Sequence, residues 1–167
     1  KNVLIYDGGQ YTTDTYFNLG GRASTNTTWT DISMMAIIRK VKRAAYVKTQ
    51  NGADFKEYLF DKIITSDRPG ELVYHNGDGV QFYNITNDII KATEEIAEYA
   101  IRELNLAYNY LLDVDILICT GGLGKILYPY FKNAFKHVEV LLAEKTGEEN
   151  PMLNFESVFA NVVGFFN

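Results

Sequence analysis

The stretch best suited to chemistry lies near the start of the sequence, where two carboxylates enclose glycines and threonines. This first loop reads Asp7-Gly8-Gly9-Gln10-Tyr11-Thr12-Thr13-Asp14. Glycines free backbone N–H groups to point at an anion, and threonine hydroxyls can join them. The carboxylates would repel a bare phosphate but suit one that carries Mg²⁺. The composition predicts a loop that holds a phosphate with its metal ion, and a plain hairpin turn is the alternative.

A second candidate lies in the second half of the chain, where an apolar strand runs straight into glycines. The strand spans residues 115–119, the second loop reads Thr120-Gly121-Gly122-Leu123-Gly124, and residues 125–135 have helical spacing. Glycines at such a turn let a ligand approach the backbone and place it at the positive end of the helix dipole. The alternative is a tight strand-to-helix turn without a ligand, so this loop alone decides little.

The spacing of apolar residues predicts the elements that hold the two loops. Strands are expected at 3–6, 15–19, 71–74, 80–83, 115–119 and 138–142, helices at 31–46, 54–64, 87–104, 125–135 and 155–166, and an irregular segment at 22–28. Thr30 or Asp31 is the expected N-cap of the first helix, and Thr86 or Asn87 that of the long one.

These elements predict an α/β fold with a mixed twisted sheet flanked by helices. Residues 1–46 and 87–167 are expected to form the core subdomain, and residues 47–86 a small inserted α+β subdomain. The strands that lead into the two glycine loops are expected to be neighbours. Both loops would then open on one cleft at the edge of the sheet.

Composition limits the class of protein. The 167 residues suffice for one domain or two small lobes, and 47% hydrophobic with 22% charged residues is ordinary for a globular protein. The net charge of −5 argues against nucleic acid as the main partner. No apolar run approaches the roughly 20 residues of a membrane helix, and no signal peptide is visible. The chain enters a strand directly after Lys1, which suggests a piece of a longer protein.

Three other groups of residues have both a chemical and a structural interpretation. Cys119 excludes an internal disulfide and is expected to be a small buried hydrophobe rather than a nucleophile. Asp113 and Asp115 could bind a metal, but a solvated turn is the expected reading. The cations between Arg39 and Arg43 could contact nucleic acid or another subunit, and a solvated helix face is again preferred.

Taken together, the two loops resemble motifs of the actin-like ATPase superfamily, which also contains sugar kinases and seventy-kilodalton heat-shock chaperones. Asp7, Gly9, Thr12, Thr13 and Asp14 fit its second phosphate motif, and residues 116–122 fit its adenosine motif. The segment Ala160-Asn161-Val162-Val163-Gly164 matches the motif that closes this half of the family's fold. Gln10 and Tyr11 depart from the small residues that are usual in the phosphate loop.

The chain is most similar to ParM-type plasmid-segregation proteins of bacteria, through its short second lobe and the Thr-Thr-Asp form of the first loop. The resemblance covers the second half of such a protein only, a ribonuclease H-like subdomain with its small insertion. It implies that the first phosphate motif and the group that positions the catalytic water belong to a lobe outside this chain.

The resemblance also implies a site for ATP or ADP with Mg²⁺. Asp7 would face the metal through water, and the phosphates would lie against the stretch that runs from Asp7 through Gly8, Gly9, Gln10 and Tyr11 to Thr12. The adenosine would lie against Gly121, Gly122 and Leu123. Residues 30–35 would border the adenine pocket.

The function implied is the ATP-binding half of a bacterial, cytoplasmic, filament-forming ATPase that segregates plasmid DNA. Its partners would be further copies of the full-length protein and a DNA-bound adaptor protein, without direct contact to nucleic acid or membrane. This half alone is expected to be inactive as an ATPase. The alternatives are a small-molecule kinase or an activator ATPase of the same superfamily, and a scaffold of this fold that has lost its nucleotide.

Overall fold

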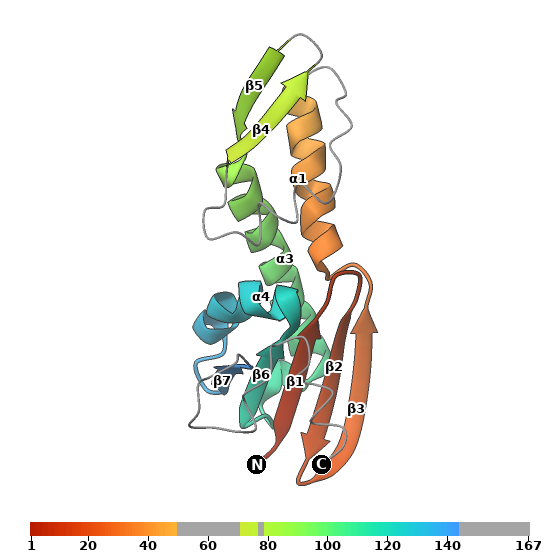
Figure 1. Cartoon of the computed structure of the whole chain (residues 1–167). Coiled ribbons are helices and arrows are strands. Elements are labelled where there is room, and N and C mark those ends of the chain that lie inside the picture. Colours follow the sequence, from red (N-terminus) through yellow and green to blue (C-terminus); the bar gives the residue numbers. More distant parts are fainter. Residues whose placement is uncertain (50–70, 77–78, 144–167) are drawn as a thin grey trace, which may run out of the picture. The chain divides into compact units, whose positions relative to one another are not determined.

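The computed structural model describes residues 1–49, 71–76 and 79–143 (Figure 1). The predicted helices at 54–64 and 155–166 and the segment Ala160–Gly164 lie outside these residues. The chain divides into two compact units, one formed by Lys1–Met34 with the chain from Ala97 onward, the other by Met35–Ile96. The subdomain boundaries expected from the sequence, at residues 46 and 87, stay a prediction.

The first unit contains a five-stranded sheet in the order β3-β2-β1-β6-β7 (Figure 1). Its strands are β1 Val3–Gly8, β2 Thr13–Leu19, β3 Arg22–Trp29, β6 Ile116–Thr120 and β7 Glu139–Leu142. The pairs β1–β2 and β2–β3 are antiparallel, whereas β1–β6 and β6–β7 are parallel. The sheet is therefore mixed, and this confirms the α/β fold expected from the sequence.

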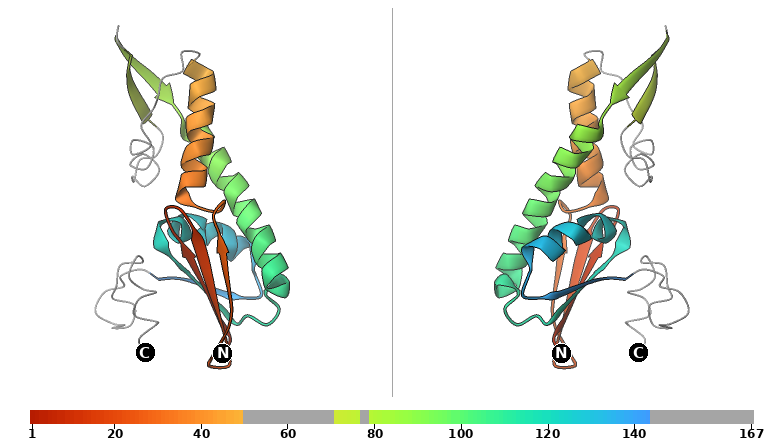
Figure 2. Two further views of the ribbon diagram at one scale, coloured as in Figure 1. Left: turned by 90° about the vertical axis from the view of Figure 1, so that its right-hand side faces the viewer. Right: turned by 90° about the vertical axis from the view of Figure 1, so that its left-hand side faces the viewer.

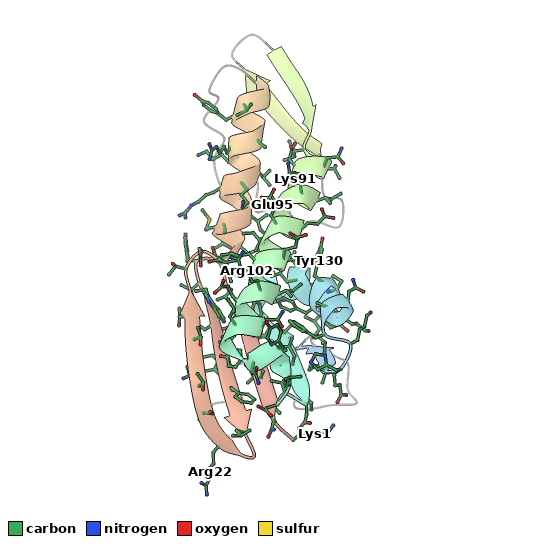
Figure 3. All side chains as sticks on the ribbon, turned by 180° about the vertical axis from the view of Figure 1, so that it is seen from behind. Lys1, Arg22, Lys91, Glu95, Arg102 and Tyr130 are labelled. Carbon is green, nitrogen blue, oxygen red and sulfur yellow. The ribbon has the colours of Figure 1, made fainter. Side chains whose placement is uncertain are left out.

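One face of this sheet packs on helices, and alternate side chains of β1 and of the first part of β2 are buried there. Tyr6 of β1 meets Phe131 of α4 (Gly121–Ala134) edge to face, with ring centroids 4.9 Å apart. On the neighbouring strand the hydroxyl of Thr15 lies 2.6 Å from the phenol of Tyr108, which follows α3 (Thr86–Ala107). Figures 2 and 3 show these helices beside the strands.

The strand β3 corrects the prediction of an irregular segment at 22–28. Gly20 and Gly21 have φ values of 57° and 87°, as a tight two-residue hairpin turn requires, and β3 pairs directly with β2. The sequence pattern misses this strand because β3 lies at the edge of the sheet. Most of its short polar side chains are exposed, so no apolar alternation marks it.

The second unit contains most of α1 (Met34–Thr49), the first part of α3 and a hairpin of β4 (Glu71–Asn76) and β5 (Gly79–Asn84). The hairpin was expected from its glycine-rich turn. Ile37, Ile38 and Val41 are fully buried, which confirms the apolar face predicted for α1. The exposed cations Arg39 and Lys40 lie on its other face, and the Lys40 ammonium forms an ion pair of 2.7 Å with Glu95.

The predicted helix starts differ from those in the structure. The first residue of α1 is Met34, so Thr30 and Asp31 do not cap it, while α3 begins at Thr86, one residue before the expected start. Because α4 begins at Gly121, the second loop is the first turn of this helix rather than a separate loop. Among the described residues, no helix is long and apolar enough to cross a membrane.

Candidate functional site

The parallel pairing of β1 with β6 brings the two glycine loops together. Asp7 at the end of β1 is the register partner of Thr120 at the end of β6. Each strand then continues into glycines, Gly8 and Gly9 on one side and Gly121 and Gly122 on the other. The expectation that these strands are neighbours is confirmed. The cleft between the loops stays a prediction.

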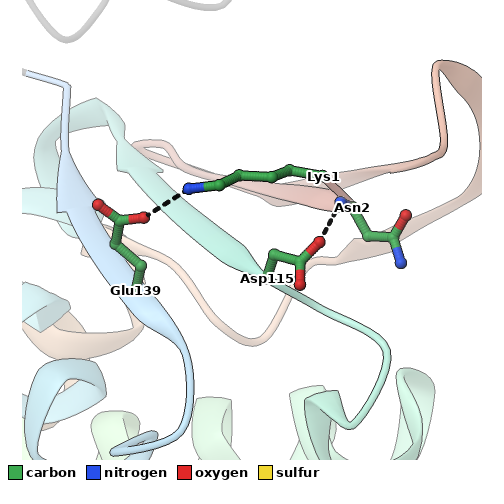
Figure 4. A network of polar contacts seen from close by, with 4 residues as sticks. All are labelled: Lys1, Asn2, Asp115 and Glu139. Carbon is green, nitrogen blue, oxygen red and sulfur yellow. Dashed lines mark hydrogen bonds and ion pairs between the residues drawn. The ribbon is translucent and has the colours of Figure 1, made fainter.

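A polar network at the opposite ends of the two strands fixes this register (Figure 4). The backbone N–H of Asn2 donates to the Asp115 carboxylate at 2.6 Å, and the N–H of Asp115 donates to the Asn2 carbonyl at 2.9 Å. The Asn2 side chain also donates to the carbonyl of Asp113 at 2.8 Å. Asp115 thus has a structural role, and the described residues contain no cluster of three or more potential metal ligands.

The first loop is tighter than its composition suggested. Because β1 continues to Gly8 and β2 begins at Thr13, only Gly9 to Thr12 form the turn. The N–H of Gly9 donates across this turn to the Thr12 carbonyl at 2.9 Å, so it is not free to point at an anion. In this part of the described chain, the N–H groups of Tyr11 and Thr12 donate to no backbone acceptor. Both groups can therefore donate to an anion.

The loop carries two carboxylates on one face of the sheet. Asp7 and Asp14 are directly opposite each other in the antiparallel pair, so their side chains point the same way. The hydroxyls of Thr12 and Thr28 donate to the Asp14 carboxylate at 3.2 and 2.5 Å. Partial burial and then the charges of Asp14 and Asp7 raise the pKa of Tyr16. This concentration of negative charge favours a bound cation.

The glycines of the two loops have different physical roles. Gly121 has a φ of 77°, and a side chain at this position would collide with the carbonyl of Gly8 and with the Asp7 carboxylate. A side chain at Gly8 would lie 2.5 Å from the backbone nitrogen of Gly124. These glycines permit close packing of the loops. At Gly122, by contrast, a side chain would meet nothing within 4 Å, so its backbone is open to a ligand.

The remaining predicted site residues divide into exposed and buried ones. Gln10 is exposed, and Tyr11 is 68% exposed, so both are accessible at the tip of the first loop. Leu123 is fully buried, so it can meet adenosine only through its backbone. Cys119 is also fully buried, which confirms the expected small buried hydrophobe, and burial raises the pKa of its thiol to about 12.

Sequence reasoning assigned no role to the inner side of the first loop. Thr13 is fully buried and donates its hydroxyl to the carbonyl of Ile32 at 2.7 Å. The N–H of Met34 donates to the carbonyl of Gly9 at 3.2 Å. Ile32 and Met34 thus contact the first loop, and the expectation that residues 30–35 border the adenine pocket stays a prediction. The alternation of Thr12, Thr13 and Asp14 along a strand was the available signal, because it directs Thr13 to the covered face.

These groups fit a nucleotide with magnesium. The carboxylate oxygens of Asp7 and Asp14 are ligands of the kind Mg²⁺ and its water shell prefer. Two N–H groups of the first turn have no backbone acceptor, and the backbone of Gly122 at the N-terminus of α4 is open. A helix N-terminus and unpaired N–H groups are both suited to anions.

The chain has an actin-like fold, and it corresponds to about half the length of the solved structures that it matches. The structure of a 15-stranded ParM filament from Clostridium botulinum is similar to this chain, with a TM-score of 0.70 and 18% sequence identity. The match covers 99% of this chain and 44% of the ParM chain. ParM of Bacillus thuringiensis with ATP has a TM-score of 0.62 and 19% sequence identity, and the match covers 99% of this chain and 47% of that ParM chain.

An archaeal actin homolog, Ta0583, matches 99% of this chain and 49% of its own, with a TM-score of 0.72 and 14% identity. The same archaeal protein has also been solved in complex with ADP. At these identities the likeness shows the fold, and the chain spans a little under half the length of these proteins. No protein-family model and no curated protein sequence matches the chain.

Proposed function

We propose that this chain is the ATP-binding half of a bacterial actin-like ATPase that forms filaments and segregates plasmid DNA. The observation that carries the proposal is the pairing of Asp7 with Thr120, which brings the two glycine loops together beyond the ends of β1 and β6. In sheets with parallel strands, ligands bind beyond the carboxyl ends of the strands, where these loops lie.

The residues of the two loops have distinct roles in this proposal. Asp7 holds Mg²⁺ through water, and the N–H groups of Tyr11 and Thr12 donate to the phosphates. Gly8 and Gly9 keep the turn close to the ligand, and the exposed side chain of Gln10 lies beside it. The backbone of Gly121, Gly122 and Leu123 lies against the adenosine. When bound, the magnesium ion neutralises phosphate charge.

The chemistry of hydrolysis needs more than this half. Phosphoryl transfer is catalysed by positioning and charge stabilisation, with a water aligned for in-line attack. We assign the positioning of that water to a second half of the protein, because this chain corresponds to less than half of the actin-like structures it matches. ATP would bind between the two halves.

Self-association and a DNA-bound adaptor are the partners in this proposal. The support for filaments is that a ParM protein of the same fold is described as a 15-stranded filament. The net charge of −5 favours an adaptor over direct contact with DNA. Plasmid segregation would place the protein in the cytoplasm.

Two measurements test the proposal. Ligand-observed NMR should detect ATP–Mg²⁺ binding to this chain, and chelation of Mg²⁺ should weaken it. Light scattering of the full-length protein should rise when ATP–Mg²⁺ is added. Binding without assembly would favour a kinase or activator ATPase of the same fold. The absence of any nucleotide response in either form of the protein would favour a scaffold and contradict the proposal.

A further inference from the structure

The turn from Gly9 to Thr12 is fastened to a segment that lies about twenty residues later in the chain. The Thr13 hydroxyl donates to the carbonyl of Ile32 at 2.7 Å. The N–H of Met34, the first residue of α1, donates to the carbonyl of Gly9 at 3.2 Å. The turn is therefore held on both sides by residues 32–34.

The Thr13 bond is buried. Thr13 and Ile32 are fully buried, and the phenol of Tyr6 lies 3.5 Å from the Thr13 hydroxyl. A buried carbonyl that loses its donor keeps the full cost of its desolvation. Removal of this hydroxyl should therefore shift the segment around Ile32 rather than leave it in place.

A second bond holds the same segment from α3. The phenol of Tyr99 donates to the carboxylate of Asp31, the residue directly before Ile32. The guanidinium of Arg102, labelled on α3 in Figure 3, lies over the Tyr99 ring at 4.7 Å from its centroid. This side-chain contact orients the ring from the helix side. Asp31 is thus tied to α3, while Ile32 and Met34 are tied to the first loop.

We propose that Thr13 and Tyr99 are positioning residues for the phosphates. They fix residues 31–34, and the Met34 N–H then fixes the Gly9 carbonyl on its side of the turn. With Gly9 held in this way, the N–H groups of Tyr11 and Thr12 stay without backbone acceptors and can receive a phosphate. This inference rests on the proposed function and adds two residues that do not touch the ligand.

The expected effect is selective for nucleotides with more than one phosphate. Loss of one hydrogen bond that positions the turn should weaken ATP–Mg²⁺ binding by about tenfold, which corresponds to ~1.4 kcal/mol. The proposal assigns the turn to the β- and γ-phosphates, which AMP lacks. The affinity for AMP should therefore change by less than about twofold, which is under ~0.4 kcal/mol.

The variants Thr13→Val, Thr13→Ser and Tyr99→Phe test this in the same chain. Thr13→Val removes the hydroxyl, and Thr13→Ser retains it and should keep ATP affinity. Tyr99→Phe removes only the phenol hydroxyl that donates to Asp31. Tyr110→Phe is the matched control, because Tyr110 is 60% exposed and lies on the turn after α3. Dissociation constants for ATP–Mg²⁺ and AMP come from NMR titration, and amide exchange reports the Met34 N–H.

The proposal predicts lower ATP affinity, unchanged AMP affinity and faster Met34 exchange in Thr13→Val and Tyr99→Phe, but not in Thr13→Ser or Tyr110→Phe. Equal losses for ATP and AMP would show a merely structural role and overturn it, and so would wild-type ATP affinity in Tyr99→Phe. If Thr13→Val does not fold, Tyr99→Phe alone decides. A wild-type chain that binds no ATP overturns the proposed function together with this inference. If the wild type binds ATP but the variants do not respond as stated, only this inference is overturned.

Discussion

Asp7 and Thr120 are register partners at the ends of two parallel strands, and each is followed by glycine. This single pairing places a carboxylate of the first loop beside the start of α4. It also explains why Gly121 must lack a side chain, since any side chain there would meet the Asp7 carboxylate. Asp7, to which we assign the magnesium ion in the proposed function, is therefore also a residue on which the packing of the two loops depends.

The first prediction concerns the charge of Asp7. Asp7→Asn keeps the size of the side chain and removes the charge, so it should abolish the Mg²⁺-dependent part of ATP affinity. We expect the ATP–Mg²⁺ affinity to fall by about ten- to a hundredfold. This corresponds to ~1.5–3 kcal/mol, the net worth of hydrogen bonds to a charged group. Titration calorimetry with and without Mg²⁺ measures this difference.

Asp113→Asn is the matched control for this charge change. Asp113 is an exposed acid on the turn before β6, and only its backbone carbonyl takes part in the Asn2 network. The variant should bind ATP–Mg²⁺ like the wild type. Equal losses in both variants would mean that overall charge, and not the position of Asp7, determines affinity.

The second prediction separates two neighbouring glycines. Gly121→Ala places a side chain in a left-handed conformation and against the Gly8 carbonyl. It should destabilise the fold by about 2–4 kcal/mol, through backbone strain and overpacking. Gly122→Ala meets no atom within 4 Å and lies in the first turn of α4. It should leave stability unchanged or raise it by up to about 1 kcal/mol, because alanine favours the helix.

Urea unfolding of the two variants measures this contrast. A Gly122→Ala variant that keeps its stability but loses ATP affinity would place the ligand against the Gly122 backbone. Equal stability of both variants would show that the collision at Gly121 is relieved by movement of the first loop, contrary to the packing argument.

Elements marked by a local sequence pattern could be predicted, whereas elements that depend on strand pairing or on contacts between distant residues could not. Apolar runs that lead into glycines mark β1 and β6, and the expectation that these strands are neighbours accompanied the resemblance to the actin-like superfamily. The strand β3 could not be predicted, because an exposed edge strand needs no apolar alternation. The contact of Thr13 with Ile32 joins residues nineteen positions apart in the chain, and only the fold brings them together. The start of α1 at Met34 depends on those same contacts.

The third prediction is a dependence of stability on alkaline pH. Burial raises the pKa of the Cys119 thiol from 9.0 to about 12, so the folded chain keeps a proton that the unfolded chain loses. The contribution of the buried, protonated Cys119 thiol to the free energy of unfolding is fully present below pH 9.0. It is lost as the pH rises toward about 12. Between these limits stability should fall by about 1.4 kcal/mol per pH unit from this group.

Comparison with Cys119→Ala isolates the thiol, because the other buried groups are common to both proteins. At neutral pH the variant should be less stable by about 1 kcal/mol, since a buried group is lost. Urea unfolding under reducing conditions should show this difference shrinking above pH 9.0. A constant difference up to pH 11 would mean that the thiol ionises in the folded chain or becomes exposed.

The last prediction concerns catalysis by this chain alone. The described site supplies carboxylates, N–H groups and open glycine backbone, which can bind a phosphate and its metal ion. In-line attack also needs a group that orients water, and we assign that group to the second half of the protein. Phosphate release from ATP by the purified chain should therefore not exceed the background without protein. Turnover that Asp7→Ala abolishes would show that this half contains a complete catalytic site, and the division of labour between the two halves would then be wrong.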